Sequence, residues 1–175
     1  LPEAVDTGRL TSLLNEVISQ TKELARGLHP VDGEPAGLTT ALQRWADHIT
    51  GIFGLSCRFE CPEPVRITDN ALATQLYRVA QEAAHNAVKH AHATEMTIRL
   101  SFTDGLMLLA VQDNGTGFSR DVSVVEGLGL QIMRHRAEAI GAVLNIQSSP
   151  NEGTQVTCSI PVSSVVSRTQ PSHET

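Results

Sequence analysis

The sequence lacks several features that would each have indicated a particular class of protein. It contains no apolar run near the ~20 residues that a membrane-spanning helix needs. It does not begin with a charged segment followed by an apolar one, so no signal peptide is visible. Basic residues are scarce, since 13 Lys and Arg stand against 19 Asp and Glu and the formal net charge is −6. This acidic balance predicts that nucleic acid is not a partner.

Cysteine is also scarce. There are three cysteines, Cys57, Cys61 and Cys158, which is an odd number. The first two are spaced C-x-x-x-C, and no second pair of ligands accompanies them, so a zinc ribbon is not expected. We therefore expect reduced thiols in a cytoplasmic domain. The full-length protein can still be anchored to a membrane by segments outside this sequence.

The residues that are present suit one medium domain with extensions, because 41% of the 175 residues are hydrophobic and 18% are charged. The first segment, residues 10–28, predicts an amphipathic helix. Its heptad seam consists of Leu10, Leu14, Val17, Thr21, Leu24 and Leu28. Such a helix must bury its seam against a partner helix. Pro30 and residues 31–35 then end it.

Three more helices are predicted from apolar residues at helical spacing. Residues 38–53 form the first. One side of it carries Leu42, Trp45, Ile49, Ile52 and Phe53. Residues 69–91 form the longest, with Asp69 as its N-cap. Its buried stripe is predicted to comprise Leu72, Leu76, Val79, Ala83, Ala87 and Val88. Residues 130–140 form the last, which Gly141 ends at the C′ position.

Five strands are predicted, over residues 55–61, 94–102, 106–111, 143–148 and 154–160. Asp104 and Gly105 join the second to the third by a hairpin turn that needs positive φ. The residues after Pro161 are rich in Ser and Thr and are predicted to be frayed. This order predicts an α+β two-layer sandwich, with helices on one face of a mixed, mostly antiparallel sheet.

The long helix carries a polar face beside its apolar stripe. Glu82, Asn86 and either Lys89 or His90 lie on this face, because they are spaced by four and then by three or four residues. Asn86 offers an amide oxygen that suits Mg²⁺. Glu82 can orient or deprotonate a hydroxyl or a water, and Lys89 can meet a phosphate. The same pattern is also typical of a solvated polar face.

Two glycine-rich segments follow buried elements. In residues 113–118 (DNGTGF), a carboxylate at the end of a strand can accept a hydrogen bond from an adenine amino group, and two glycines permit close approach of a flat ligand. In residues 127–130 (GLGL), a helix start offers free N–H groups to phosphate. A surface turn and a flexible loop are the respective alternatives. Neither segment fits the G-x-x-x-x-G-K-[ST] or the G-x-G-x-x-G nucleotide motif.

Together these motifs resemble the ATP-binding catalytic domain of sensor histidine kinases, which has the Bergerat fold. Residues 81–91 (QEAAHNAVKHA) resemble its N box and residues 113–118 its G1 box. Residues 127–130 and 133–141 (MRHRAEAIG) resemble the G2 box and helix of the short-lid subfamily that pairs with helix-turn-helix response regulators. Gly153 and Thr154 match the late Gly-Thr of the wider superfamily, which includes gyrase-type topoisomerases and mismatch-repair ATPases. The resemblance covers residues 38–161.

The resemblance implies an adenine end of the site. Asp113 is similar to the carboxylate that reads adenine, and Gly117 to the glycine close to the base. Thr154 is similar to the hydroxyl that helps Asp113 and a water hold the base. Gly115 and Phe118 complete the same binding segment.

The resemblance also implies a phosphate end. Asn86 is similar to the Mg²⁺ ligand, and Glu82 to the acidic residue one turn earlier. Lys89 and His90 are expected as phosphate neighbours. The lid glycines and the residues after them are expected near the phosphates: Gly127, Leu128, Gly129 and Leu130. His85 lies inside the N box, whereas His48, His92 and His135 are expected as surface or packing residues.

The function implied by the resemblance is that of a histidine protein kinase, which binds ATP and Mg²⁺ and delivers the γ-phosphate to a histidine elsewhere. A short lid over residues 118–127 would order over the nucleotide. His29 is not expected to be the acceptor, because Pro30 follows it at a helix end and no H-box-like segment precedes it. An anti-sigma-factor-type serine kinase and a non-catalytic ATP-dependent switch are the alternatives.

The expected organisation has three parts. Residues 1–35 resemble the end of the dimerisation and phosphoacceptor domain, residues 36–162 form the ATP-binding domain, and residues 163–175 form a flexible tail. The implied partners are the phosphoacceptor helix of the same or a partner subunit, a response regulator, and a second copy in a homodimer.

Overall fold

A computed structural model describes residues 37–63, 65–119, 127–161 and 166–168. The chain divides into two units, Leu1–Pro30 and Val31–Thr175, and all described residues lie in the second. The predicted heptad helix, His29 and most of the predicted lid lie outside the described residues. The elements are α2 (Gly37–Phe53), β1 (Ser56–Glu60), β2 (Val65–Ile67), α3 (Asn70–His90), β3 (Glu95–Thr103), β4 (Leu106–Asp113), α4 (Leu128–Glu138), β5 (Val143–Ser149), β6 (Gly153–Pro161) and β7 (Val166–Arg168).

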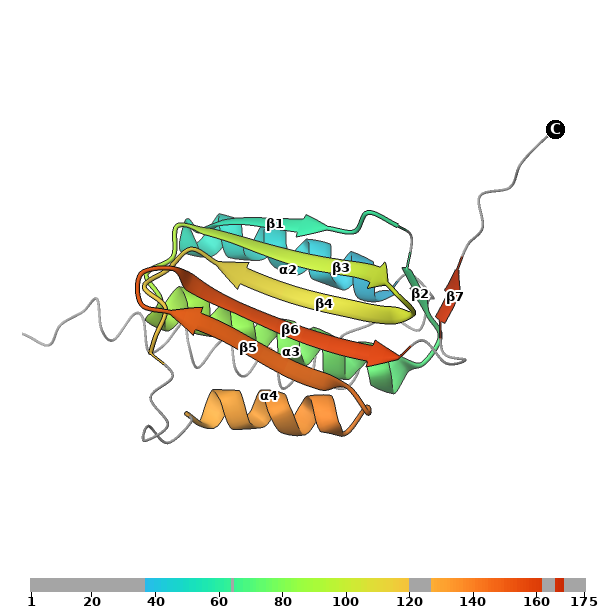
Figure 1. The fold of residues 1–175 in the computed structure, drawn as a ribbon. Helices are drawn as coiled ribbons and strands as arrows, with labels where there is room; N and C mark the ends of the chain where they lie inside the picture. Colours follow the sequence, from blue (N-terminus) through green and yellow to red (C-terminus); the bar gives the residue numbers. More distant parts are fainter. Residues whose placement is uncertain (1–36, 64, 120–126, 162–165, 169–175) are drawn as a thin grey trace, which may run out of the picture. The chain divides into compact units, whose positions relative to one another are not determined.

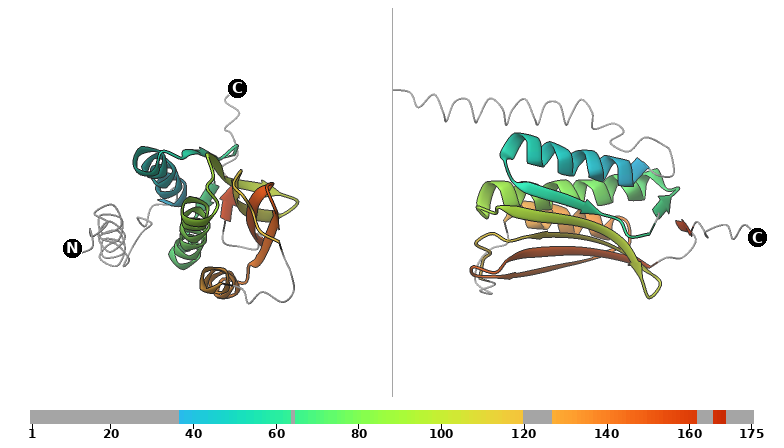
Figure 2. Two further views of the ribbon diagram at one scale, coloured as in Figure 1. Left: turned by 90° about the vertical axis from the view of Figure 1, so that its left-hand side faces the viewer. Right: turned by 90° about the horizontal axis from the view of Figure 1, so that it is seen from above.

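Five of the strands form one mixed sheet in the order β1-β3-β4-β6-β5. β1 runs parallel to β3, and the other neighbouring pairs are antiparallel. The helices α2, α3 and α4 all lie on one face of this sheet, as the side and top views show (Figures 1 and 2). The predicted α+β two-layer sandwich is confirmed.

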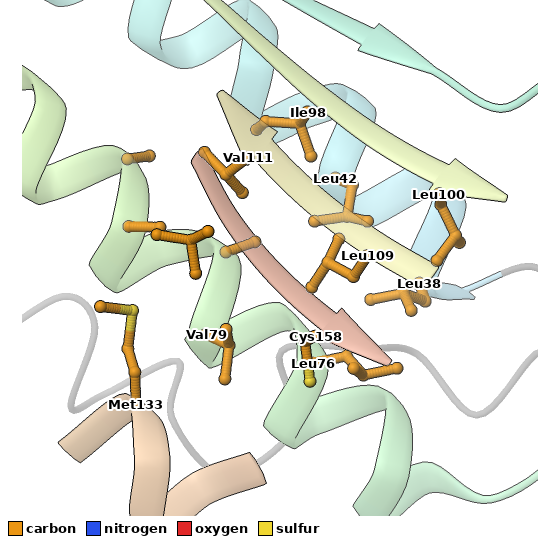
Figure 3. Packing of buried hydrophobic residues seen from close by; sticks show 14 of the residues in the cluster. Leu38, Leu42, Leu76, Val79, Ile98, Leu100, Leu109, Val111, Met133 and Cys158 are labelled. Carbon is orange, nitrogen blue, oxygen red and sulfur yellow. The ribbon is translucent and has the colours of Figure 1, made fainter. Parts of the chain in front are cut away.

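The core lies between this helix layer and the inner face of the sheet (Figure 3). In β3 and β4 every second residue is buried, so Ile98 lies opposite Val111 and Leu100 opposite Leu109. Met133 of α4 is fully buried. Strict alternation in the sheet and helical spacing in the helices therefore give the two layers complementary apolar faces.

Helix α3 begins where its cap residue predicts. The side chain of Asp69 accepts hydrogen bonds from the backbone amides of Ala71 (2.8 Å) and Leu72 (3.1 Å). The predicted stripe from Leu72 to Ala87 is buried, and Val88 is partly buried. This anchored helix gives its C-terminal turns a fixed place beside the sheet.

Helix α2 differs from the prediction at its C-terminal end. Ile52 and Phe53, which were predicted on the apolar side, are 62% and 51% exposed. The chain turns at Gly54, whose φ is +67°, and Leu55 is buried instead. Periodicity alone could not show that the helix extends beyond its buried contacts before this turn.

The two glycine turns behave as predicted. Asp104 and Gly105 both have positive φ, as the hairpin between β3 and β4 requires. After α4, the amide of Gly141 donates to the carbonyl of Glu138, and the amide of Ala142 donates to that of Ala137. With φ of +66° at Gly141, this is a Schellman motif, which ends the helix at the predicted residue.

A second, two-stranded sheet was not predicted. β2 pairs antiparallel with β7, so Val166–Arg168 forms a strand where the sequence analysis expected a frayed, flexible tail. Strands of three residues are too short for an alternation pattern to identify them. Val65 and Ile67 of β2 are buried, so this short element adds to the core.

None of the helices described is long and apolar enough to cross a membrane.

Candidate functional site

Asp113 lies at the carboxyl end of β4, directly opposite Thr154 of β6. It is only 8% exposed and is the one buried polar or charged residue in the part of the chain that the structure describes. The amide of Gly115 donates to Asp113 Oδ1 at 2.8 Å, and the amide of Thr154 also bonds to this side chain. Burial raises the pKa of the Asp113 carboxyl, and these two hydrogen bonds offset part of that rise. The sheet therefore holds a hydrogen-bond acceptor in a largely dry position.

The loop after Asp113 is tied to its surroundings by hydrogen bonds. Asn114 Oδ1 accepts from the backbone amides of Thr94 (2.9 Å) and Glu95 (3.0 Å). The amide of Thr116 donates to the carbonyl of Ala91, the C-cap of α3, at 2.7 Å. The sequence analysis did not identify Asn114 as a functional residue, although its place between the site carboxylate and a glycine was a signal. Its side chain fixes the loop against the start of β3.

The glycines of this loop are required by the protein's own packing. A Cβ atom at Gly115 would overlap Ala91. Gly117 has φ of +56°, and a Cβ atom there would overlap the backbone carbonyl oxygen of Ser149 and approach that of Gly153. The sequence analysis expected these glycines to make room for a flat ligand. The observed reason is different, because the space beside each Cβ position is filled by protein.

Ser148 joins this loop to β6 and was missed by the sequence analysis. Its Oγ atom accepts from the amide of Phe118 at 2.9 Å and donates to the carbonyl of Gly153 at 3.0 Å. It also lies 3.0 Å from Thr154 Oγ1. Its place two residues after Ile146, on the inward-facing side of the predicted strand, was the available signal in the sequence.

A second group of predicted residues gathers where α3 meets the start of α4. Glu82 and Asn86 are half-buried on one face of α3. A Cβ atom at Gly129 would overlap the Glu82 carboxylate and would lie 3.5 Å from the Asn86 side-chain nitrogen. The structure thus brings Glu82, Asn86 and Gly129 together, although they are far apart in the sequence. Lys89 and His90 are exposed in the last turn of α3.

Gly127, the N-cap of α4, is exposed, and a Cβ atom there would meet none of the described residues within 4 Å; residues 120–126 just before it are not among them. Gly127 also has an ordinary φ of −58°, so neither conformation nor packing requires a glycine. Leu128 is 73% exposed and Phe118 38%, whereas Leu130 is half-buried and packs against the core. His48, His85, His92 and His135 are exposed.

The two groups lie at the same end of the sheet, where β4 and β5 end, β6 begins and α4 starts (Figure 1). Helix α3 connects the group at Asp113 with the group at Gly129. Its C-cap, Ala91, contacts the loop after Asp113, and Asn86 lies five residues earlier in the same helix. At 1.5 Å per residue this separation along the helix is about 7–8 Å. Buried acceptors at one end and helix-start amides at the other could therefore serve one extended, polar ligand.

Comparison with known proteins adds sequence evidence. Residues 71–164 match the profile of the family described as histidine kinase-, DNA gyrase B-, and HSP90-like ATPase. The oxygen sensor histidine kinase NreB of Staphylococcus carnosus is 30% identical over 162 residues, which cover 91% of this chain and 47% of NreB. The sensor protein VraS of Staphylococcus aureus (strain COL) is 40% identical over 87 residues, which cover 50% of this chain and 25% of VraS. The chain thus spans less than half the length of these relatives.

Solved structures support the fold. The histidine kinase domain of the blue-light activated histidine kinase EL346 of Erythrobacter litoralis superposes with a TM-score of 0.60 at 24% identity, covering 75% of this chain and 64% of that one. Full-length ShkA, crystallised in complex with AMPPNP, superposes with a TM-score of 0.63 at 18% identity, covering 92% of this chain and 40% of ShkA. At these identities the likeness concerns the fold alone.

Proposed function

We propose a function from the family of this chain. The chain belongs to the histidine kinase-, DNA gyrase B- and HSP90-like ATPases, and in our proposal it is the ATP-binding catalytic domain of a two-component sensor histidine kinase. ATP is the nucleotide that this family implies. In the proposed function the domain binds Mg–ATP and presents the γ-phosphate to a histidine outside this chain. Phosphoryl transfer of this kind depends mainly on positioning and charge neutralisation.

The observation that carries the proposal is the Asp113 carboxyl, buried at a strand end beside Thr154. A carboxylate has about four lone-pair positions, and the amides of Gly115 and Thr154 use two of them, so it can still accept a hydrogen bond from a ligand. In the proposed role the carboxylate accepts a hydrogen bond from the adenine amino group. Thr154 and a water assist it, with Gly115, Gly117 and Phe118 forming the surrounding loop.

The phosphate end of the proposed site uses α3 and the start of α4. Asn86 would offer its amide oxygen to Mg²⁺, and Glu82 beside it would orient or deprotonate the attacking group. Across the described ranges, no three His, Cys, Asp or Glu side chains gather to hold a metal ion. Mg²⁺ usually binds few protein oxygens together with substrate phosphates and water, so the Asn86 amide oxygen, next to the Glu82 carboxylate, fits it.

The phosphates would meet the backbone amides at the open start of α4, where the helix dipole favours negative charge. The residues proposed there are Gly127, Leu128, Gly129 and Leu130. Lys89 and His90, exposed near the end of α3, are proposed as further phosphate neighbours. The proposed partners are the phosphoacceptor helix of the same or a partner subunit, a response regulator, and a second copy in a full-length homodimer.

Detection of phosphohistidine on the parent protein tests the proposal. A histidine kinase forms acid-labile phosphohistidine when it is incubated with Mg–ATP. An anti-sigma-factor-type kinase would instead form acid-stable phosphoserine on its partner, and a non-catalytic switch would bind ATP without transfer. The absence of phosphohistidine, with ATP binding intact, would rule out the proposed activity and favour one of these two alternatives.

A further inference from the structure

Ser148 makes three polar contacts from one oxygen atom. Its Oγ accepts from the amide of Phe118 at 2.9 Å, donates to the carbonyl of Gly153 at 3.0 Å, and lies 3.0 Å from Thr154 Oγ1. Ser148 is half-buried. No motif identified it, yet it touches both the loop at Phe118 and the hydroxyl proposed to face the adenine.

The number of available hydrogens fixes the direction of the third contact. A serine hydroxyl has one hydrogen to donate and two lone pairs that accept. The Phe118 amide can only donate and the Gly153 carbonyl can only accept, so the hydrogen of Ser148 is used by Gly153. The one remaining lone pair of Ser148 requires a donor, and Thr154 must supply it. The hydrogen of the Thr154 hydroxyl is then used by Ser148, so Thr154 can offer a ligand only its lone pairs and can act only as a hydrogen-bond acceptor.

We propose that Ser148 is a positioning residue that makes the Thr154 hydroxyl a hydrogen-bond acceptor and thereby favours a purine with an amino group over one with a carbonyl group at the same position. The inference rests on the proposed placement of adenine at Asp113 and Thr154. These two residues form a cross-strand pair, so their side chains project from the same face of the sheet. The carboxylate of Asp113 is likewise an acceptor.

Two adjacent acceptors are complementary to the two N–H bonds of a purine amino group, whereas a 6-carbonyl purine places an oxygen there and a single N–H on the neighbouring ring nitrogen. With Ser148 intact, Thr154 cannot turn its hydrogen toward the ligand without leaving the Ser148 contact unsatisfied. Removal of the Ser148 hydroxyl frees that hydrogen. Thr154 can then donate to a carbonyl oxygen, and the discrimination between the two kinds of base decreases.

The test is calorimetric titration of the whole chain with ATP and with inosine triphosphate, which carries a carbonyl group in place of the amino group. The wild-type protein should prefer ATP, and Ser148→Ala should lower the ratio of the two affinities about fivefold, the size of one ordinary hydrogen bond. Ser148→Thr keeps the hydroxyl and should restore the ratio. Ser159→Ala is the matched control, because Ser159 also donates to a backbone carbonyl between β5 and β6, that of Val143.

A double-mutant comparison separates this role from general damage to the fold. If Ser148 acts through Thr154, Ser148→Ala should change the affinity ratio no further in a Thr154→Val background. An equal change in both backgrounds, or an unchanged ratio in Ser148→Ala, overturns the inference. If the wild-type protein does not prefer ATP and Asp113→Asn does not alter its binding, the proposed adenine site fails as well. Loss of the preference in Asp113→Asn but not in Ser148→Ala would contradict the Ser148 inference alone.

Discussion

At Asp113 the chain is held by its own hydrogen bonds, whereas at Gly127 it is open. The loop from Asp113 to Phe118 is fixed to β3 by Asn114, to α3 through Ala91 and to β5 through Ser148. At the start of α4, in contrast, a Cβ atom on the N-cap Gly127 would meet nothing within 4 Å in the part of the chain that the structure describes. The adenine end of the proposed site is therefore preformed, whereas at the phosphate end no described residue crowds Gly127.

The glycines of the two regions are present for different physical reasons. Gly115 and Gly117 are required by the packing of the fold, because a Cβ atom at either would overlap protein atoms. Gly127 is required by neither packing nor backbone conformation. A glycine that the fold does not need is better evidence of ligand approach than one that it does need. Gly115 and Gly117 thus report mainly on folding, whereas Gly127 reports on function, and Gly129 lies between these cases because a Cβ atom there would overlap the Glu82 side chain.

The largest expected effect is on stability, from Gly117→Ala. Its positive φ and the overlap with the backbone of Ser149 predict a loss of about 2–4 kcal/mol in the free energy of unfolding. Urea denaturation measures this loss. Gly105→Ala is the matched control: it has a similar positive φ but nothing within 4 Å, so about 1–2 kcal/mol is expected. Equal losses would show that packing at Gly117 is not the constraint.

Asp113→Asn should remove ATP binding while the domain stays folded. The substitution replaces a charge-assisted acceptor with a group that also presents a donor, which costs about 1.5–3 kcal/mol of binding free energy. Calorimetry measures the affinity, and an unchanged value would contradict the adenine role.

The pH dependence of ATP binding provides the control for Asp113. Because burial raises the pKa of this carboxyl, the wild-type affinity for ATP should fall as pH drops through that raised pKa. The free energy of unfolding should change in the opposite direction and rise as the pH drops. A carboxyl whose pKa is higher in the folded than in the unfolded state makes the fold less stable as pH rises through that window.

Asn86→Ala should remove the increase in ATP affinity that Mg²⁺ produces, with a loss of about tenfold in apparent metal affinity. Asn86→Asp keeps an oxygen ligand and should retain the metal dependence. Titrations with and without Mg²⁺ measure the difference. If Asn86→Ala responds to Mg²⁺ as the wild type does, Asn86 is not the ligand.

The smallest expected effect is a difference between two ligands. Gly129→Val should weaken triphosphate binding more than adenosine binding, by about 1 kcal/mol, because its side chain blocks the start of α4 and displaces Glu82. Gly127→Ala should cost about 0.5–1 kcal/mol of stability, because alanine is a poorer N-cap than glycine. Equal losses for both ligands in Gly129→Val would indicate misfolding or a wrongly placed site.

Much of the fold could be predicted because its signals are local. Asp69, Gly141 and the Asp104–Gly105 turn act within a few residues, and alternation in β3 and β4 places Ile98 and Leu109 in the core. The exposed C-terminal end of α2 and the pairing of β2 with β7 could not be predicted, because they depend on contacts between distant segments. The same holds for the site: motifs indicated Asp113 and Thr154, but only the structure showed that they lie opposite each other and that Ser148 contacts the Thr154 hydroxyl.

Phosphate transfer in a mixture of two chains tests the central claim most directly. This chain is incubated with Mg–ATP, alone and together with a fragment of the parent protein that carries the first helix of the phosphoacceptor domain. Mass spectrometry then locates the phosphate. The account predicts no acid-labile phosphate on the chain alone and phosphohistidine on the added fragment, formed slowly because the covalent link that supplies proximity is missing. Phosphate on His29 of the isolated chain would contradict it, and so would phosphoserine without phosphohistidine in the mixture.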